Sequence, residues 1–316
     1  MNNRSSTGGQ GLAGKLIDAV FGGFMSVLLP GFGQLHNGQW NKAAWLFLLF
    51  CAATLAVNSL VTLFVPPEWF SYAFFAALAA APLIWLYAVL DAMICGWKRS
   101  NHKLQRWQTF PVYTLAFLLG HGIWLGVVDG LIMQGIVREH LIDRFRIPSE
   151  SMEPGLRRGD WFFADKRVNC PGCTHRVGAG DVVLFTTENR PDLVVVKRVI
   201  GMPGDTIVID GINVLRNGKS LTKKSTNAKN GGIRVVERIR NKTYTAFWRD
   251  KRDKHQEYTV PQGHIFVMGD NRTRSRDSRF IGPVPLENVI AIPRQIFLSH
   301  TKDFDIRWKR VGKVVR

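Results

Sequence analysis

Three long apolar runs in the first half of the chain limit its fold more than any other feature. They cover residues 43–65, 70–96 and 110–137, and each is longer than the roughly 20 helical residues needed to cross a bilayer. Within a bilayer, a single segment can satisfy all of its backbone amides and carbonyls only as a helix. We therefore expect three transmembrane helices.

An earlier apolar segment, 16–35, is interrupted by Gly22-Gly23 and by a Pro-Gly-Phe-Gly sequence at 30–33. Such breaks disfavour a simple spanning helix. We expect an interfacial or re-entrant segment within residues 1–42, and whether it crosses the membrane stays open. It has no small-residue cleavage site after a short apolar core, so we expect it to remain attached.

The loop between the second and third runs is rich in basic residues. Loops with an excess of Lys and Arg stay in the cytoplasm, so we expect residues 1–42 in the cytoplasm and the chain after Val137 on the exocytoplasmic side. The basic residues of this loop are Lys98, Arg99, Lys103 and Arg106.

The sequence changes character after Val137. Short β-branched runs such as 194–199 and 206–209 are separated by glycine turns, a pattern typical of strands in a mostly-β domain. The expected fold class is therefore an α-helical multi-pass membrane anchor, residues 43–137, followed by an exocytoplasmic β-rich domain, residues 138–316.

The composition combines 46% hydrophobic residues with a formal net charge of +18. A nucleic-acid partner would fit this charge, but the chain shows neither a basic helix with interleaved aromatics nor a known reading motif. Basic residues are scattered over the predicted strands and loops instead, which suits anionic lipid headgroups. We expect membrane lipids and no nucleic acid as partners, and a solvated basic surface stays open. The basic residues scattered over the predicted strands and loops include Lys223, Lys224, Arg234 and Arg238.

The four cysteines divide between the two halves. Cys51 and Cys95 lie in apolar runs, where a thiol usually packs as a small apolar group. Cys170 and Cys173 frame a Cys-Pro-Gly-Cys sequence. A structural zinc site normally has four ligands, and only His175 is near. We therefore prefer a disulfide in an oxidising compartment over a metal site, and redox activity stays open.

Two serines, Ser149 and Ser151, follow soon after the last apolar run. A serine hydroxyl is a poor nucleophile at neutral pH and needs a base within hydrogen-bond reach. Lys197 lies in the sequence Leu-Val-Val-Val-Lys-Arg-Val-Ile, whose burial would favour the neutral amine that acts as a base. On the strand alone, Lys197 also fits an ordinary charge on an edge strand.

Four short motifs follow one another along the second half. They are Ser-x-Ser-Met-x-Pro at 149–154, Gly-Asp-Val-Val at 180–183, Lys-Arg-x-x-Gly-x-Pro-Gly-Asp at 197–205 and Gly-Asp-Asn-Arg at 269–272. In this set the chain resembles the bacterial type I signal peptidases, or leader peptidases, which are serine peptidases with a Ser/Lys dyad. The resemblance covers residues 145–289 and includes a variable stretch, 214–261, that we interpret as an inserted β-hairpin region.

The resemblance implies roles for individual residues. Ser151 would be the nucleophile and Lys197 the general base, while the Ser149 hydroxyl and the Ser151 backbone N–H would bind the oxyanion. Ser275 would orient Lys197. No cofactor and no metal is needed. The charged residues expected to brace the surrounding loops are Arg198, Asp270, Asp277 and Arg279.

The chain departs from the family pattern at two positions. Gly155 stands where threonine is common and Arg274 where asparagine is common, which puts loop rigidity and substrate preference in doubt. The endoplasmic-reticulum relatives have a histidine in place of Lys197, so the match is to the bacterial and organellar branch. We expect His175, His255 and His264 on the surface or in turns, and a histidine base stays open.

The resemblance implies a membrane-bound serine endopeptidase of the bacterial inner membrane. It would remove N-terminal signal peptides from exported preproteins on the periplasmic side. The resemblance also implies small side chains at the first and third positions before the cleaved bond. The alternatives are a specialised processing peptidase of the same fold and a non-enzymatic membrane scaffold.

Overall fold

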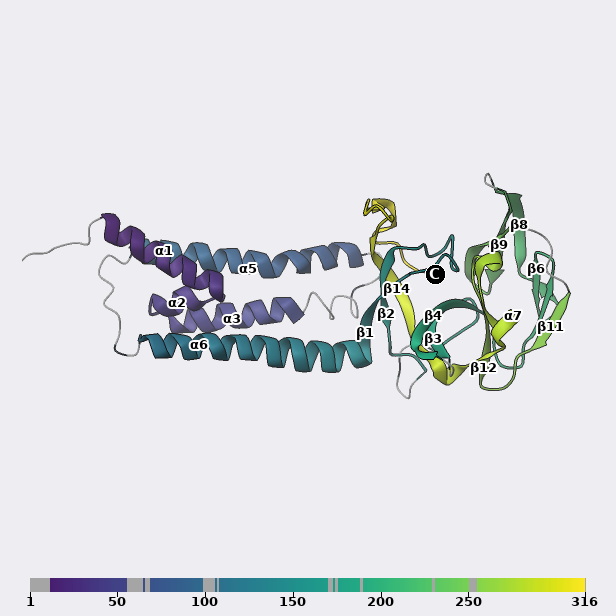
Figure 1. Ribbon diagram of the computed structural model, residues 1–316, viewed down its shortest axis with the longest axis horizontal. Helices are drawn as coiled ribbons and strands as arrows, with labels where there is room; N and C mark the ends of the chain where they lie inside the picture. Colours follow the sequence, from purple (N-terminus) through teal and green to yellow (C-terminus); the bar gives the residue numbers. More distant parts are fainter. Residues whose placement is uncertain are drawn as a thin grey trace, which may run out of the picture. The chain divides into compact units, whose positions relative to one another are not determined.

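The computed structural model divides the chain into two compact units. One holds residues 1–65 and 72–138, and the other holds residues 66–71 and 139–316. The first is helical and the second is rich in strands (Figure 1). The structure describes residues 12–55, 65, 69–98, 106, 108–169, 173, 176–187, 190–228, 231–249 and 255–315.

The helical unit contains two described helices that are long and apolar enough to cross a membrane, Phe75–Lys98 and Phe110–Leu141. They correspond to the second and third predicted spans. The first predicted span begins in a shorter apolar helix, and its residues 56–64 lie outside the described residues. The helices are α1 (Leu12–Leu28), α2 (Phe32–His36), α3 (Trp40–Leu55), α5 (Phe70–Lys98), α6 (Phe110–Gly122) and the π-helix η2 (Ile123–Leu141).

The predicted interruption at Gly22-Gly23 is wrong, because α1 runs through both glycines. A Cβ on Gly22 would lie 3.2 Å from the Ala92 carbonyl oxygen of α5, and a Cβ on Gly33 would lie 2.0 Å from the Gly22 carbonyl oxygen. Small residues permit such close approach of helix backbones. The pair is therefore a packing site, and the chain turns later, where Gly31 has a φ of 93°.

Several polar side chains of the helical unit form hydrogen bonds around Gln34. Gln34 is fully buried; its Nε2 donates to the Ala88 carbonyl at 2.7 Å and to Asp91 Oδ2 at 3.0 Å. Ser26 Oγ donates to Gln34 Oε1 at 3.1 Å, and Lys42 pairs with Asp91 at 2.6 Å. Apolar surroundings require such pairing, since an unpartnered polar group there is costly.

The described strands of the β-rich unit form three antiparallel sheets. The largest has seven strands in the order β1-β2-β14-β3-β4-β12-β13, and the others have the orders β11-β5-β6-β7 and β10-β9-β8. After η2 ends at Leu141, described helix is limited to α7 (Ser278–Ile281) and the 3₁₀ turns η3 (Arg272–Arg274), η4 (Leu286–Asn288) and η5 (Trp308–Arg310). The prediction of a mostly-β domain after N-terminal helices is confirmed.

The strands include both of the β-branched runs that the sequence singles out, which lie in β4 and β5. Their bounds are β1 (Ile142–Arg146), β2 (Asp160–Asp165), β3 (Val182–Thr187), β4 (Arg190–Gly201), β5 (Thr206–Asp210), β6 (Asn213–Arg216), β7 (Lys219–Ser220), β8 (Thr222–Asn227), β9 (Ile233–Ile239), β10 (Lys242–Trp248), β11 (Gln256–Thr259), β12 (His264–Met268), β13 (Val284–Pro285) and β14 (Val289–Ser299).

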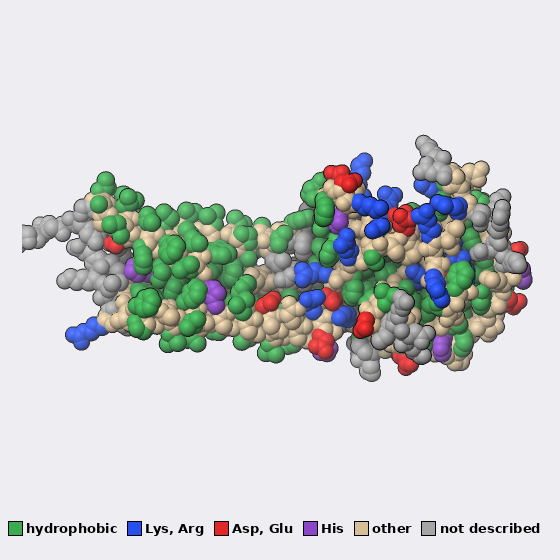
Figure 2. Space-filling model, viewed as in Figure 1, with side chains coloured by type: hydrophobic (Ala, Val, Ile, Leu, Met, Phe, Trp, Pro, Cys, Tyr) green, Lys and Arg blue, Asp and Glu red, His purple; other side chains and the backbone are tan. Residues whose placement is uncertain are grey.

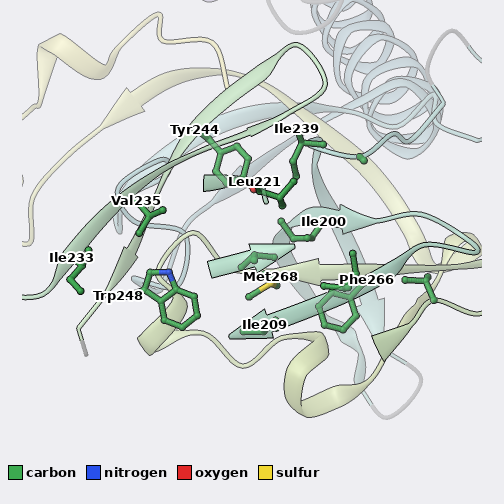
Figure 3. Packing of buried hydrophobic residues seen from close by; sticks show 14 residues of the cluster. Ile200, Ile209, Leu221, Ile233, Val235, Ile239, Tyr244, Trp248, Phe266 and Met268 are labelled. Atoms are coloured by element: carbon green, nitrogen blue, oxygen red, sulfur yellow. The ribbon is translucent and has the colours of Figure 1, made fainter. Parts of the chain in front are cut away.

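One buried cluster joins residues 214–261 to the rest of the unit (Figure 3). Val235 of β9 and Trp248 of β10 pack with Ile200 of β4 and Phe266 of β12, and all four are 2% exposed or less. The region is therefore more than a hairpin on the surface, because its strands lie in two sheets and supply part of a shared core.

Trp248→Ala is expected to lower the free energy of unfolding by about 3–5 kcal/mol, the usual effect of truncating a buried aromatic side chain. Trp308→Ala is the matched control, because Trp308 is 68% exposed and its loss should matter by less than about 0.5 kcal/mol. Chemical denaturation of the detergent-solubilised chain, followed by circular dichroism, measures both. Equal effects would contradict this core.

Candidate active site

Lys197 lies inside the seven-stranded sheet. Its strand, β4, pairs with β3 on one side and with β12 on the other. The side chain is 4% exposed. The interpretation of Lys197 as an edge-strand charge is therefore wrong, and the apolar strand withdraws the amine from water.

Lys197 Nζ forms a hydrogen bond of 2.9 Å with Ser151 Oγ and donates to the Val196 carbonyl at 3.0 Å. Burial lowers the pKa of Lys197 from its ordinary value of 10.5 to about 8, while the negative charges of Asp277 and Asp270 act in the opposite direction. With that pKa, about a tenth of the amine is neutral at pH 7. The amine can therefore accept a proton from the serine hydroxyl.

Ser151 lies in a turn between β1 and β2. The next residue, Met152, and Leu156 are each 1% exposed, and the Leu156 N–H donates to the Met152 carbonyl at 2.9 Å. These buried side chains fix the turn. Ser149 Oγ lies 3.2 Å from Ser151 Oγ, so the structure brings together the two serines that the sequence singles out. A role for Ser149 at the oxyanion stays a prediction.

Ser275 approaches the same turn. It is 6% exposed, and its hydroxyl has no hydrogen-bond partner among the described residues. A Cβ on Gly269 would lie 2.3 Å from Ser275 Oγ and 2.5 Å from the Ser151 carbonyl oxygen. The missing side chain of Gly269 therefore allows the two loops to meet, while the orienting role of Ser275 toward Lys197 stays a prediction.

A buried ion pair holds the strand of Lys197 to the loop after β12. Arg198 Nε and Nη2 each lie 2.8 Å from Asp270, one from each carboxylate oxygen, and both residues are 2% exposed or less. Arg198 Nη1 also donates to the Gly180 carbonyl at 2.9 Å, and its guanidinium lies 4.1 Å from the centre of the Tyr244 ring. Three of the four sequence motifs thus meet at Arg198.

A second ion pair supports the loop that carries Gly269. Arg279 Nε donates to Asp277 Oδ1 at 2.8 Å, and the Gly269 N–H donates to Asp277 Oδ2 at 2.9 Å. Arg279 Nη2 donates to the Arg272 carbonyl at 2.5 Å. These contacts fix the loop beside Ser275, which suits a bracing role for Asp277 and Arg279.

The sequence does not single out Glu237, which lies in β9. Arg272 Nη1 lies 2.8 Å from Glu237 Oε1 and Nη2 lies 2.5 Å from Oε2, and the Tyr244 hydroxyl donates to Oε2 at 2.7 Å. Glu237 is fully buried. A signal was present, because strand alternation places Glu237 on the same face as Val235 and Ile239, where an unpaired charge would be costly.

The two departures from the family pattern both lie beside Ser151. A Cβ on Gly155 would lie 2.6 Å from Asp270 Oδ2, so glycine fits the present position of Asp270 and a larger residue would displace that carboxylate. Arg274 forms a surface ion pair with Glu150, which links its loop to the residue before Ser151.

Some of the other predicted site residues lie outside the described residues. Cys173 takes part in a disulfide, whereas Cys51 and Cys95 are free thiols. Cys170 lies outside the described residues, so its pairing with Cys173 stays a prediction. Among the described residues, no group of three or more His, Cys, Asp or Glu side chains could hold a metal ion.

Of the three histidines that the sequence analysis considers, two are described. His255 is exposed, and His264 at the start of β12 contacts the Gln262 carbonyl through Nδ1 at 3.0 Å. His175 lies outside the described residues. The basic side chain that forms a hydrogen bond with Ser151 in the structure is that of Lys197.

A protein-family model described as signal peptidase, peptidase S26, matches residues 122–298, which is more than half of the chain. The chain belongs to this family of signal peptidases. The resemblance seen in the four sequence motifs is thereby confirmed.

Similar proteins carry the same description. A signal peptidase I from Pseudomonas aeruginosa is 29% identical over 191 residues, covering 52% of this chain and 67% of that protein. One from Bacillus licheniformis is 32% identical over 155 residues, covering 48% of this chain and 74% of that protein. A solved signal peptidase I from Enterococcus faecalis has 27% identity and a TM-score of 0.25, covering 37% of this chain and 97% of that chain.

Gly269→Ala is expected to lower peptidase activity by at least about tenfold, because the added methyl group would push apart Ser275 and the turn of Ser151 and so disturb a geometry that tolerates little misplacement. Gly178→Ala is the matched control, since a Cβ there meets its nearest atoms at 3.5 Å. Cleavage assays on both purified variants, with circular dichroism as a folding check, make the comparison. Full activity of Gly269→Ala would contradict the packing described.

Proposed function

We propose that this chain is a membrane-bound serine endopeptidase that removes N-terminal signal peptides from exported proteins. The observation that carries the proposal is the 2.9 Å hydrogen bond between Ser151 Oγ and the buried amine of Lys197. Membership of the signal peptidase family gives this pair its chemical meaning. A scaffold would have no use for a lysine with a lowered pKa beside a serine hydroxyl.

In the first half of the reaction, Lys197 Nζ takes the proton of Ser151 Oγ as this oxygen attacks the scissile carbonyl carbon. The negative charge that develops on the carbonyl oxygen is bound by the Ser149 hydroxyl and the Ser151 backbone N–H. Lys197 then passes its proton to the nitrogen of the leaving mature protein, and the C–N bond breaks. The signal peptide remains attached to Ser151 as an ester.

In the second half, water replaces the leaving amine. Lys197 takes a proton from this water as it attacks the ester carbonyl and returns the proton to Ser151 Oγ when the ester bond breaks. The signal peptide leaves with a free carboxyl end, and Ser151 and Lys197 are restored.

Ser275 and the buried charges act as positioning residues in this proposal. The Ser275 hydroxyl, buried without a partner among the described residues, would orient Lys197. Arg198 and Asp270, with Asp277 and Arg279, hold the loops on which Ser151 and Ser275 lie.

The location follows from the apolar helices and the basic loop of the sequence. We propose a multi-pass anchor over residues 43–137, with residues 1–42 in the cytoplasm and the peptidase domain, 138–316, on the periplasmic side of a bacterial inner membrane, with 214–261 as an inserted β region. The two long apolar helices support it. Preprotein signal peptides and membrane lipids are the partners, and nucleic acid is not expected.

Ser151→Ala and Lys197→Met are each expected to reduce cleavage of a preprotein with an Ala-x-Ala site by at least about 10³-fold, as removal of a nucleophile or its base usually does. Lys219→Met removes an exposed lysine and should cut as the unaltered chain does. If the unaltered chain fails on several such preproteins, a specialised processing peptidase takes precedence.

The pH dependence of kcat/KM should follow Lys197. The base must be neutral, so activity rises about tenfold per pH unit below the pKa of about 8 and levels off above it. A stopped assay across pH 5–10 measures the profile. A break near pH 6.5 would indicate a histidine base instead.

A further inference from the structure

A cleft of about 510 Å³ lies beside the turn of Ser151. Met152, Pro154 and Arg157, from the segment after Ser151, form one wall, and the outer face of the β10-β9-β8 sheet forms another. The last described residues, including Lys313, also line it. Its size lies in the range of pockets that hold ligands.

The cleft is basic. Arg157, Arg234 and Lys313 line it, and none of the three forms an ion pair among the described residues. Asp270 is the one acidic residue in its described lining, and Arg198 binds that carboxylate on both oxygens. The lining of the cleft therefore carries an excess of positive charge.

The pKa of Lys313 reflects the excess of positive charge in the cleft. Burial lowers the pKa of Lys313, the positive charges of Arg310 and Arg157 lower it further, and the negative charge of Asp160 acts in the opposite direction. Figure 2 shows Lys and Arg side chains gathered on the viewed face of the β-rich unit. An acidic ligand would relieve the repulsion.

The sheet wall suits a polypeptide. Arg234 lies opposite Thr226, and Val236 lies opposite Thr245, so their side chains share one face of the sheet. The hydroxyl groups of these threonines and of Thr243 and the apolar side chain of Val236 thus surround the basic side chain of Arg234. A phosphate group alone would need only the charges, whereas an extended peptide also uses the hydroxyl and apolar surfaces.

The cleft begins close to the nucleophile along the chain. Pro154 is three residues after Ser151, a span of at most about 11 Å. An extended substrate covers about 3.3 Å per residue, so its third to fifth residues from the cut reach the cleft. The family resemblance implies small side chains just before the cleaved bond. Acidic residues that reach the cleft would therefore come from the mature protein, after the cleaved bond.

We propose that this cleft binds acidic side chains of the exported protein a few residues after the cleaved bond. The inference rests on the proposed function, since it makes the cleft a specificity site for that reaction. Arg234 and Lys313 supply the charge, and the threonine hydroxyls contact the peptide.

The test uses two preproteins that differ only at the third to fifth mature residues, which are all Glu in one and all Gln in the other. The unaltered chain should show a KM about 3- to 10-fold lower for the Glu substrate, with similar kcat, and the difference should shrink at high salt. The Ser151→Ala chain should show the same preference as a ratio of Kd values in fluorescence anisotropy.

Arg234→Gln combined with Lys313→Gln should bring the KM for the Glu substrate to that for the Gln substrate. Lys219→Gln combined with Arg240→Gln removes equal charge from a different surface depression and should leave the preference unchanged. Equal KM values with the unaltered chain, or a preference that survives Arg234→Gln/Lys313→Gln, would overturn the proposal.

Two further outcomes separate the alternatives. If Arg234→Gln/Lys313→Gln loses binding to phosphatidylglycerol vesicles but keeps the Glu preference, the cleft is a lipid site and the proposal falls. If neither substrate is cut while Ser151→Ala still binds the Glu form more tightly, the proposed function falls and the acidic site stands.

Discussion

Burial of Lys197 between β3 and β12 withdraws its amine from water, and desolvation lowers its pKa to about 8. An edge strand would leave the same side chain hydrated, with a pKa near 10.5 and little neutral base. The position of β4 inside the sheet is therefore the condition for the proposed chemistry of Lys197. The negative charges of Asp270 and Asp277 moderate the shift.

The buried charges around Lys197 are matched with one another. Arg198 pairs with Asp270, and Arg272 pairs with Glu237, each with both carboxylate oxygens. Breaking a buried pair by removing one partner typically costs about 3–5 kcal/mol, because the remaining charge is uncompensated. These pairs join the strand of Lys197, the loop of Gly269 and residues 214–261, so the region that looks inserted in the sequence takes part in fixing the site.

The sequence singles out Ser151 and Lys197, which the structure brings within hydrogen-bond distance, but it predicts the residues that support them less completely. Ser151 and Lys197 are identifiable because a serine nucleophile needs a base and because their motifs occur in family order. Glu237 was missed, since its partner, Arg272, is distant in the sequence and their contact depends on how β9 packs. Gly22-Gly23 was interpreted as a break because small residues in a helix indicate either flexibility or close packing, and only the neighbouring α5 decides between them. The basic cleft is likewise a product of three segments that meet only in the folded chain.

The measurement that tests this account most directly is an NMR titration of Lys197 in the detergent-solubilised chain, using lysine labelled with ¹³C at Cε and Lys197→Met to assign the signal. The burial of Lys197 predicts a midpoint near pH 8. A midpoint near 10.5, the ordinary value for lysine, would mean that the amine is charged at neutral pH and cannot serve as the base for Ser151.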